Sequence, residues 1–371
     1  MKNRALIVVC CIVGMLSANL ASAAIQPSFG VGCAWNATDI VVVTQKPDGL
    51  TVLETWHGQL KKDEQISVVG LPFAPIRVST QFDELYKQAG KEPPTKAKTV
   101  SGERIVLFLK PLEIKPDAEI TARPVIKTFQ GASFWTGAYN AAISSAVWFD
   151  QEQSYAFMQM MNPGPSELHP YGISEENLKK TALAILAEKD SLEKAKSVVN
   201  PTERVAALLP LTRGSFGQTR RESLVELGKC GKPALSVLKE MIGNDAYGQS
   251  EVIKAIAEAS GTDAGQENVA ILEKEFAFWK AKAPELDVGW WNNAGGSYDS
   301  EAWSRLNKLR NRYGIMYSGL WILRNHPYPP SRELVTQILE FWTSQPQFKD
   351  MKQVCETCEQ VLKVLDQHVH Q

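Results

Sequence analysis

The chain has 371 residues, in which 40 Lys and Arg stand against 41 Asp and Glu for a formal net charge of -1. This near balance argues against nucleic acid as a partner, because nucleic-acid binding usually requires a clustered basic excess. Hydrophobic residues make up 44% of the chain and charged residues 22%, which excludes wholesale disorder and is typical of globular proteins. The length suggests about two domains.

Residues 1–23 have the pattern of a cleavable export signal. Lys2 and Arg4 make a basic start, an apolar run from Ala5 to Leu16 follows, and Ala21-Ser22-Ala23 fits a small-residue cleavage site. A spanning helix needs about 20 apolar residues, and neither this run nor any later one is long enough. We therefore expect cleavage, a periplasmic or extracellular location, and a mature chain without a membrane span.

Residues 38–110 alternate short β-branched runs with polar turns. The sequence predicts strands over 39–44, 50–56, 66–69 and 105–109. Short strands joined by polar turns are typical of a small sandwich or barrel. The charged stretch 81–98, which holds a Pro pair, predicts a short helix followed by an exposed loop.

Three motifs in this part resemble the netrin-like modules of secreted proteins. They are Cys33-Ala34-Trp35 ahead of Asp39-Ile40-Val41-Val42, then Val52-Leu53-Glu54-Thr55-Trp56-His57-Gly58, and Gly102-Glu103-Arg104-Ile105-Val106-Leu107-Phe108. The resemblance covers about 80 residues. It implies an OB-type β-barrel, although this chain lacks the second cysteine that such modules usually have near the last strand.

A change of hydrophobic period divides the chain. A hairpin is predicted over 147–159, and Asn162-Pro163-Gly164-Pro165 then interrupts regular structure. From Ser174, which can cap a helix, the apolar spacing is helical. Helices are predicted from 174 and over 201–209, 219–227, 233–241, 250–259, 267–280, 301–325, 331–342 and 351–366.

The sequence therefore predicts an α+β fold in two parts. After the signal at 1–23 come a β-rich domain over 24–165, forming a small barrel or sandwich, and an all-α domain over 166–371. Within the second, Arg221–Gly228 followed by Pro233–Leu238 resembles one unit of a HEAT-type repeat, and a similar pattern returns after about 33 residues. The resemblance implies stacked helix pairs whose concave face holds a partner protein or peptide.

Four cysteines follow the predicted signal, and they leave three kinds of chemistry open. Cys33, Cys230, Cys355 and Cys358 are disulfide candidates in an oxidising compartment. Cys355 and Cys358 lie three residues apart, and His368 and His370 follow, so a four-ligand zinc site is an alternative. Unpaired thiols are the third possibility. No cofactor is expected.

A second candidate site is the segment that joins two predicted helices. Exposed aromatic rings beside amides and a carboxylate are a common way to hold sugars or peptides. Alternatively, the tryptophans fold back into the core as anchors for a long loop. The candidate residues are Trp290, Trp291, Asn292, Asn293, Tyr298 and Asp299.

No catalytic signature accompanies these candidates. The chain has no G-x-S-x-G, no H-E-x-x-H, no Gly-rich phosphate loop and no EF-hand loop. The sequence favours a non-enzymatic exported protein that binds another protein or peptide through its helical half. The alternatives are a cell-envelope enzyme or carbohydrate-binding protein that uses the 290–299 loop, and a metal or redox protein that uses Cys355 and Cys358.

Overall fold

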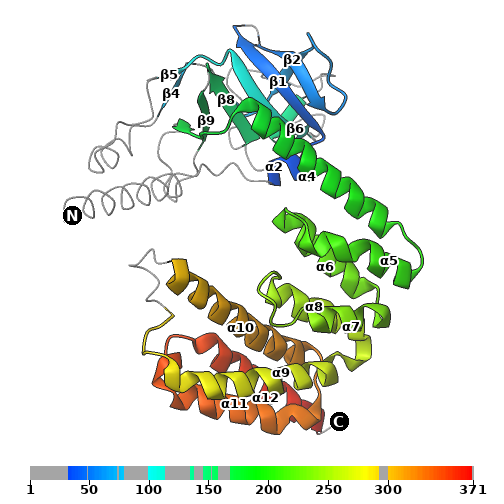
Figure 1. Cartoon of the computed structure of the whole chain (residues 1–371), viewed down its shortest axis with the longest axis vertical. Helices are drawn as coiled ribbons and strands as arrows, with labels where there is room; N and C mark the ends of the chain where they lie inside the picture. Colours follow the sequence, from blue (N-terminus) through cyan, green and yellow to red (C-terminus); the bar gives the residue numbers. More distant parts are fainter. Residues whose placement is uncertain are drawn as a thin grey trace, which may run out of the picture. The chain divides into compact units, whose positions relative to one another are not determined.

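The computed structural model describes residues 32–47, 49–72, 75–78, 99–112, 134–137, 145–151, 153–157, 168–291 and 300–369. It divides the chain into two compact units, Met1–Ala187 and Glu188–Gln371, which we describe separately. An N-terminal β-sheet region is followed by a helical half, so the predicted two-part α+β class is confirmed (Figure 1). The division between the units falls within helix α4 (Glu175–Lys196), whereas the sequence places a border at residue 165.

The first unit is built on an eight-stranded sheet in the order β1-β2-β3-β7-β6-β8-β9-β10, with an additional pairing of β1 with β6. The strands β4 and β5 form a separate two-stranded sheet. The structure confirms the sheet, while this order does not by itself establish the predicted barrel. The elements are α2 (Gly32–Asn36), β1 (Asp39–Lys46), β2 (Gly49–His57), β3 (Gln65–Val68), β4 (Ile76–Arg77), β5 (Thr99–Val100), β6 (Arg104–Pro111), β7 (Phe134–Gly137), β8 (Ala146–Asp150), β9 (Gln153–Phe157) and β10 (Leu168–Pro170).

Strand β1 is an interior strand of the sheet, because it pairs antiparallel with β2 on one edge and with β6 on the other. Its run Asp39–Val43 is entirely buried. A continuous apolar run suits such a position better than a strict alternation would. The predicted strands over 39–44, 50–56 and 105–109 thus correspond to β1, β2 and β6, and the predicted hairpin corresponds to β8 and β9.

A buried carboxylate closes the turn after β2. Asp39 Oδ1 accepts hydrogen bonds from the backbone N–H groups of Gln59, at 2.7 Å, and Leu60, at 3.1 Å. A Cβ added to Gly58 would lie 2.1 Å from the same Oδ1 atom, and Gly58 has φ +100°. Only glycine therefore fits this position, both for its backbone and for the space available.

We predict that Gly58→Ala lowers stability far more than Gly70→Ala. Both glycines have positive φ, so alanine costs roughly 1–2 kcal/mol at either position. At Gly70, where φ is +80°, nothing lies within 4 Å of the new Cβ, whereas at Gly58 the overlap with Asp39 adds roughly 1–3 kcal/mol. Denaturant unfolding measures the difference, and equal losses in the two variants would contradict this packing.

The start of α4 (Glu175–Lys196) is attached to the sheet by ion pairs within the first unit. Arg104 on β6 donates to both carboxylate oxygens of Glu175, at 2.5 and 2.6 Å, and Lys179 pairs with Glu54 on β2. The hydrogen bond from Lys179 lowers the pKa of Glu54, against the opposing effect of burial. These contacts hold the first turns of α4 against β2 and β6.

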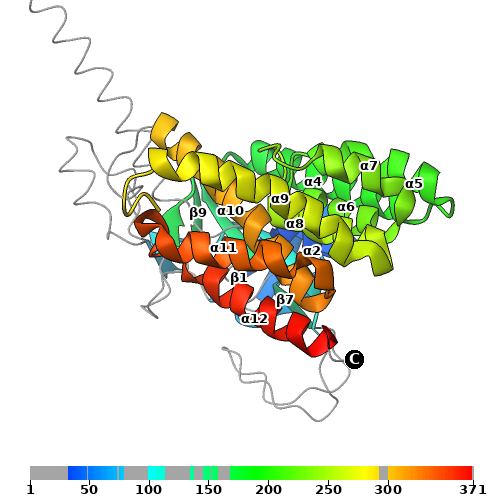
Figure 2. The ribbon, with the colours of Figure 1, turned by 90° about the horizontal axis from the view of Figure 1, so that it is seen from below.

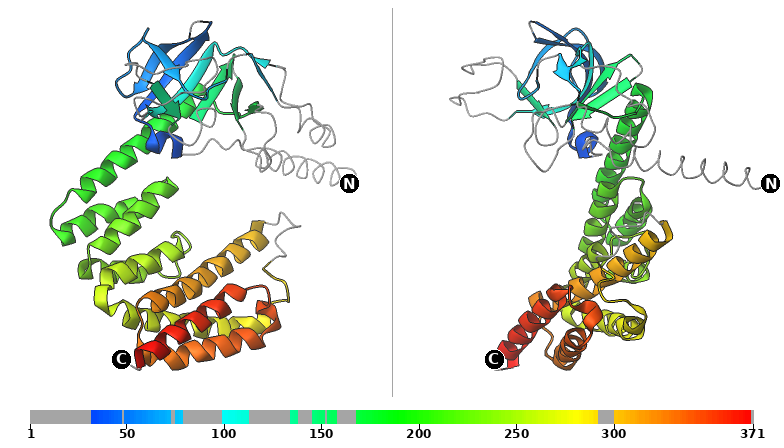
Figure 3. Two further views of the ribbon diagram at one scale, coloured as in Figure 1. Left: turned by 180° about the vertical axis from the view of Figure 1, so that it is seen from behind. Right: turned by 90° about the vertical axis from the view of Figure 1, so that its left-hand side faces the viewer.

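In the second unit, helices that are two apart in the sequence pack against each other. α6 packs on α8, α8 on α10, and α10 on α12, while α5 packs on α7 and α9 on α11. Figures 2 and 3 show α11, in orange, beside α12, in red. After α4, the helices are α5 (Pro201–Leu208), α6 (Gly217–Lys229), α7 (Lys232–Glu240), α8 (Gln249–Ser260), α9 (Ala264–Lys282), α10 (Ser300–Asn325), α11 (Arg332–Ser344) and α12 (Lys352–Val369).

The predicted helices are confirmed, with ends that differ by a few residues. At α5, for example, the side chain of Asn200 caps the helix by accepting from the N–H groups of Thr202 and Glu203, and Pro201 occupies the first turn. No helix in the described part of the chain has both the length and the hydropathy needed to cross a membrane. The predicted signal at 1–23 and the predicted short helix and loop at 81–98 lie outside the described residues.

Candidate binding surface on helix α10

Helix α10 is buried along one side. Helices α8, α9 and α12 pack against it. Four of its apolar side chains are fully buried, namely Ile315, Met316, Leu320 and Leu323. Gly319 lies so close to α9 that an added Cβ would approach the Leu272 side chain to 2.8 Å. The core contacts on this side leave a different set of residues on the opposite side of the helix.

Five half-buried residues recur along one face of α10. Their spacing of four, three, four and three residues places them within a narrow sector, because an α-helix has 3.6 residues per turn. We call this set the α10 row. It consists of Arg310, Gly314, Tyr317, Trp321 and Arg324.

The aromatic rings of this region form a connected chain. Trp291 lies 5.0 Å from Tyr313, which stacks on Tyr317 at 6.3 Å with an interplanar angle of 8°. The Arg310 guanidinium lies over Trp291 at 5.3 Å, and that of Arg324 lies over Trp321 at 5.7 Å. Such cation–π contacts restrict the orientation of the two arginine side chains.

The structure separates the two tryptophans of the predicted loop. Trp290 is 8% exposed and its ring packs 6.0 Å from Trp279 in the core. Trp291 is half-buried and reaches Tyr313 and Arg310. The other predicted residues, Asn292, Asn293, Tyr298 and Asp299, lie outside the described residues.

The α10 row contains the residue types that contribute most binding energy at protein interfaces. Trp, Tyr and Arg are the residues most enriched among those that carry binding energy. Sequence analysis missed this row because a helix of this length shows polar and apolar residues all round, and only the neighbouring helices decide which side is covered. The available signal was the recurrence of Arg, Tyr, Trp and Arg at helical spacing.

A buried ion pair joins α10 to α9 on another side. Glu275 is 2% exposed, and its Oε2 lies 3.0 Å from Arg312 Nη2. The Arg312 guanidinium also lies 4.1 Å from the centre of the Phe278 ring. Burial raises the pKa of Glu275 to about 7, against the opposing effect of Arg312.

We predict that Glu275 makes the protein less stable as the pH rises. Its pKa is about 7 in the folded state and near the ordinary 4.5 in the unfolded chain, so the folded state holds the extra proton between these values. The contribution of Glu275 to the free energy of unfolding is full below about pH 4.5. It is lost as the pH rises through about 7, at up to about 1.4 kcal/mol per pH unit.

Glu275→Gln tests this by removing the titration while keeping the shape. Denaturant unfolding between pH 5 and 8 should show a smaller fall in stability than in the unmodified protein. Glu273→Gln, at an exposed position of the same helix, should keep the original pH dependence. An unchanged slope in Glu275→Gln would contradict the assignment.

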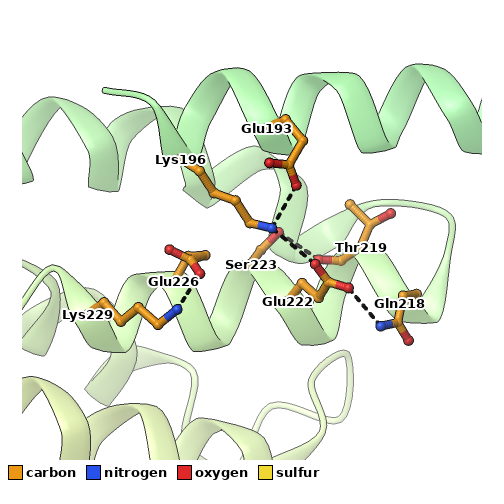
Figure 4. A network of polar contacts seen from close by, with 8 residues as sticks. All are labelled: Glu193, Lys196, Gln218, Thr219, Glu222, Ser223, Glu226 and Lys229. Atoms are coloured by element: carbon orange, nitrogen blue, oxygen red, sulfur yellow. Dashed lines mark hydrogen bonds and ion pairs between the residues drawn. The ribbon is translucent and has the colours of Figure 1, made fainter. Parts of the chain in front are cut away.

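Figure 4 shows a second polar cluster, where the end of α4 meets α6. Lys196 Nζ lies 2.8 Å from a Glu193 oxygen and 3.2 Å from a Glu222 oxygen, and Gln218 donates to Glu222 at 2.8 Å. Burial acts to lower the pKa of Lys196, but the two carboxylates raise it overall. A lysine held fully charged between carboxylates suits helix attachment rather than proton transfer.

Three of the candidate metal ligands, Cys355, Cys358 and His368, do not form a metal-binding group in the structure. The described residues contain no group of three or more His, Cys, Asp or Glu that could hold a metal ion. His368 Nδ1 lies 3.0 Å from the Val364 carbonyl of its own helix, and His370 lies outside the described residues. Cys355 is half-buried near Thr343, at 3.9 Å, and Cys358 is 0% exposed.

In the part of the chain that the structure describes, Cys33, Cys230, Cys355 and Cys358 are present as thiols. Cys33 donates to Ser145 Oγ at 3.9 Å in the first unit, and Cys230 donates to the Glu226 carbonyl at 3.3 Å in the second. Burial raises the pKa values of Cys230, Cys355 and Cys358. A raised thiol pKa lowers the thiolate fraction and with it the reactivity. A disulfide among the four cysteines stays a prediction.

Alkylation of the native protein with iodoacetamide distinguishes free thiols from a disulfide at Cys355 and Cys358. We predict that Cys355 is labelled before Cys358, because Cys358 is fully buried and its thiol is the less accessible. Peptide mass analysis at successive times measures the order. Earlier labelling of Cys358 would contradict the placement on α12, and protection of both residues until a reductant is added would demonstrate the predicted disulfide.

Comparison with known protein families, curated proteins and solved structures gave no match for this chain.

Proposed function

We propose that the protein is an exported, non-enzymatic binding protein that holds another protein or a peptide through its helical half. The observation that carries this proposal is the α10 row, in which half-buried Tyr317 and Trp321 lie between Arg310 and Arg324 on one helix face. Rings that are already ordered by stacking lose little conformational freedom when a partner covers them.

The packing of the helices supports a HEAT-like repeat architecture for this half. Helices that are two apart in sequence, such as α6 and α8, or α8 and α10, are neighbours in space. Stacked two-helix units produce this pattern, and proteins built from them commonly bind partners along extended surfaces. The α10 row would then be one segment of such a surface.

Strand pairing supports an OB-type barrel in the first unit. β1 pairs with β2, β2 with β3, β3 with β7, β7 with β6, and β6 with β1. A sheet whose strand pairings return to the first strand can close on itself. The β3–β7 pair is parallel, while the other pairs of this circuit are antiparallel.

Export is the part of the proposal that rests on sequence alone. The basic start, apolar run and Ala21-Ser22-Ala23 support cleavage and delivery to a periplasmic or extracellular compartment. A partner is expected in the same compartment.

Site-specific photo-crosslinking tests the binding function. A photoreactive amino acid replaces Trp321 in the α10 row, and a matched protein carries it at Val225, which is 49% exposed on α6. In the native compartment we expect one discrete adduct from position 321 that Tyr317→Ala weakens at least about threefold, since interface aromatics usually contribute 1 kcal/mol or more. Identical adduct patterns from both positions, or none from position 321, would contradict the proposal.

A further inference from the structure

We infer that a surface hollow at the turn between α11 and α12 binds a small molecule that has an apolar body and one anionic group. The hollow has a volume of about 510 Å³, which is typical of small-molecule sites. It shares no residue with the α10 row, so it is a second site of the helical unit. We call it the α11–α12 hollow, and its lining includes Phe348, Lys349, Lys352, Cys355 and Glu359.

The packing of the turn shapes the hollow before a ligand arrives. α11 ends at Gln345, which adopts the extended conformation that a following proline favours. A short helical turn then buries the Phe348 ring, which stacks on Trp342 at 4.4 Å with an interplanar angle of 20°. The Thr343 hydroxyl on α11 lies 3.9 Å from the Cys355 thiol on α12. The end of α11 therefore meets α12 at the hollow, and buried rings form part of its lining.

Two lysines supply positive charge to the hollow. Lys349 lies in the turn and Lys352 begins α12, and both are exposed. Neither lysine makes an ion pair with another residue that the structure describes, in contrast to Lys196, which lies between two carboxylates. A lysine ammonium has three donors on a flexible stem, so it can adapt to a carboxylate, phosphate or sulfonate.

The single acidic residue of the lining determines how the ligand lies. Cys355 and Glu359 follow Lys352 by three and seven residues, so the three side chains share one face of α12. Glu359 is roughly 10 Å from Lys352 along the helix, at a rise of 1.5 Å per residue. Repulsion by Glu359 favours an anionic group at the lysine end. The apolar body then extends over half-buried Cys355.

Binding of the dye anilinonaphthalene sulfonate to the full-length protein tests the inference. Its uncharged parent, phenylnaphthylamine, has the same rings but no sulfonate, and both dyes fluoresce more strongly in apolar surroundings. We expect saturable binding of the sulfonate. Lys349→Gln with Lys352→Gln should weaken this binding about fivefold, as expected for the loss of two exposed ion pairs. The same change should leave the affinity for the uncharged dye unaltered.

Lys254→Gln is the matched control. This lysine of α8 is also exposed, lies outside the hollow, and makes no ion pair within the described part of the chain. Its replacement should leave the affinities for both dyes unchanged, and thermal unfolding confirms that each variant folds.

Alkylation of Cys355 locates the bound dye. In the reduced protein, anilinonaphthalene sulfonate at about ten times its Kd should slow labelling of Cys355 by iodoacetamide roughly tenfold, because only the unoccupied site reacts. Labelling of Cys230, at the end of α6, should not change. Absence of saturable binding, equal affinity in the double lysine variant, or unchanged labelling of Cys355 would overturn the inference. The α10 row is tested separately, by crosslinking from position 321.

Discussion

Burial of the Trp279 indole is the interaction on which the helical unit depends. This ring is 0% exposed and lies 5.6 Å from Trp342, 5.6 Å from Phe348 and 6.0 Å from Trp290. It thereby connects α9 with α11, with the turn after α11, and with the middle of the α9–α10 connection. Aromatic side chains bury large areas and favour edge-to-face packing, so one residue can stabilise several helices at once.

The position of α10 follows from this core. Because α9 is held by its aromatic contacts, Leu272 and Glu275 present one side of it to α10, where they meet Gly319 and Arg312. The residues of α10 that pack there become unavailable for binding. The α10 row is not among these residues and stays half-buried, so the candidate binding surface is a consequence of how the core orients the helix.

Sequence periodicity predicted most of the elements but not the surface. The runs that became β1, β2 and β6 and the helices from α4 onward were evident because their apolar spacing is local. The short strand Phe134–Gly137 was not predicted, since it is defined by pairing with the distant β3 and β6. The different exposures of Trp290 and Trp291 also depend on partners far along the chain, such as Trp279 and Tyr313. Cys358 shows the same limit: its spacing from Cys355 indicated a shared site, but its burial places it in the core.

The most direct test of this account compares the stability of two tryptophan variants. Trp279→Ala should cost about 3–5 kcal/mol because it empties a fully buried site, whereas Trp321→Ala, in the half-buried row, should cost less than about 1 kcal/mol. Denaturant unfolding of both variants gives these values. A large loss in Trp321→Ala, comparable to that in Trp279→Ala, would show that the α10 row belongs to the core and would contradict its assignment as a binding surface.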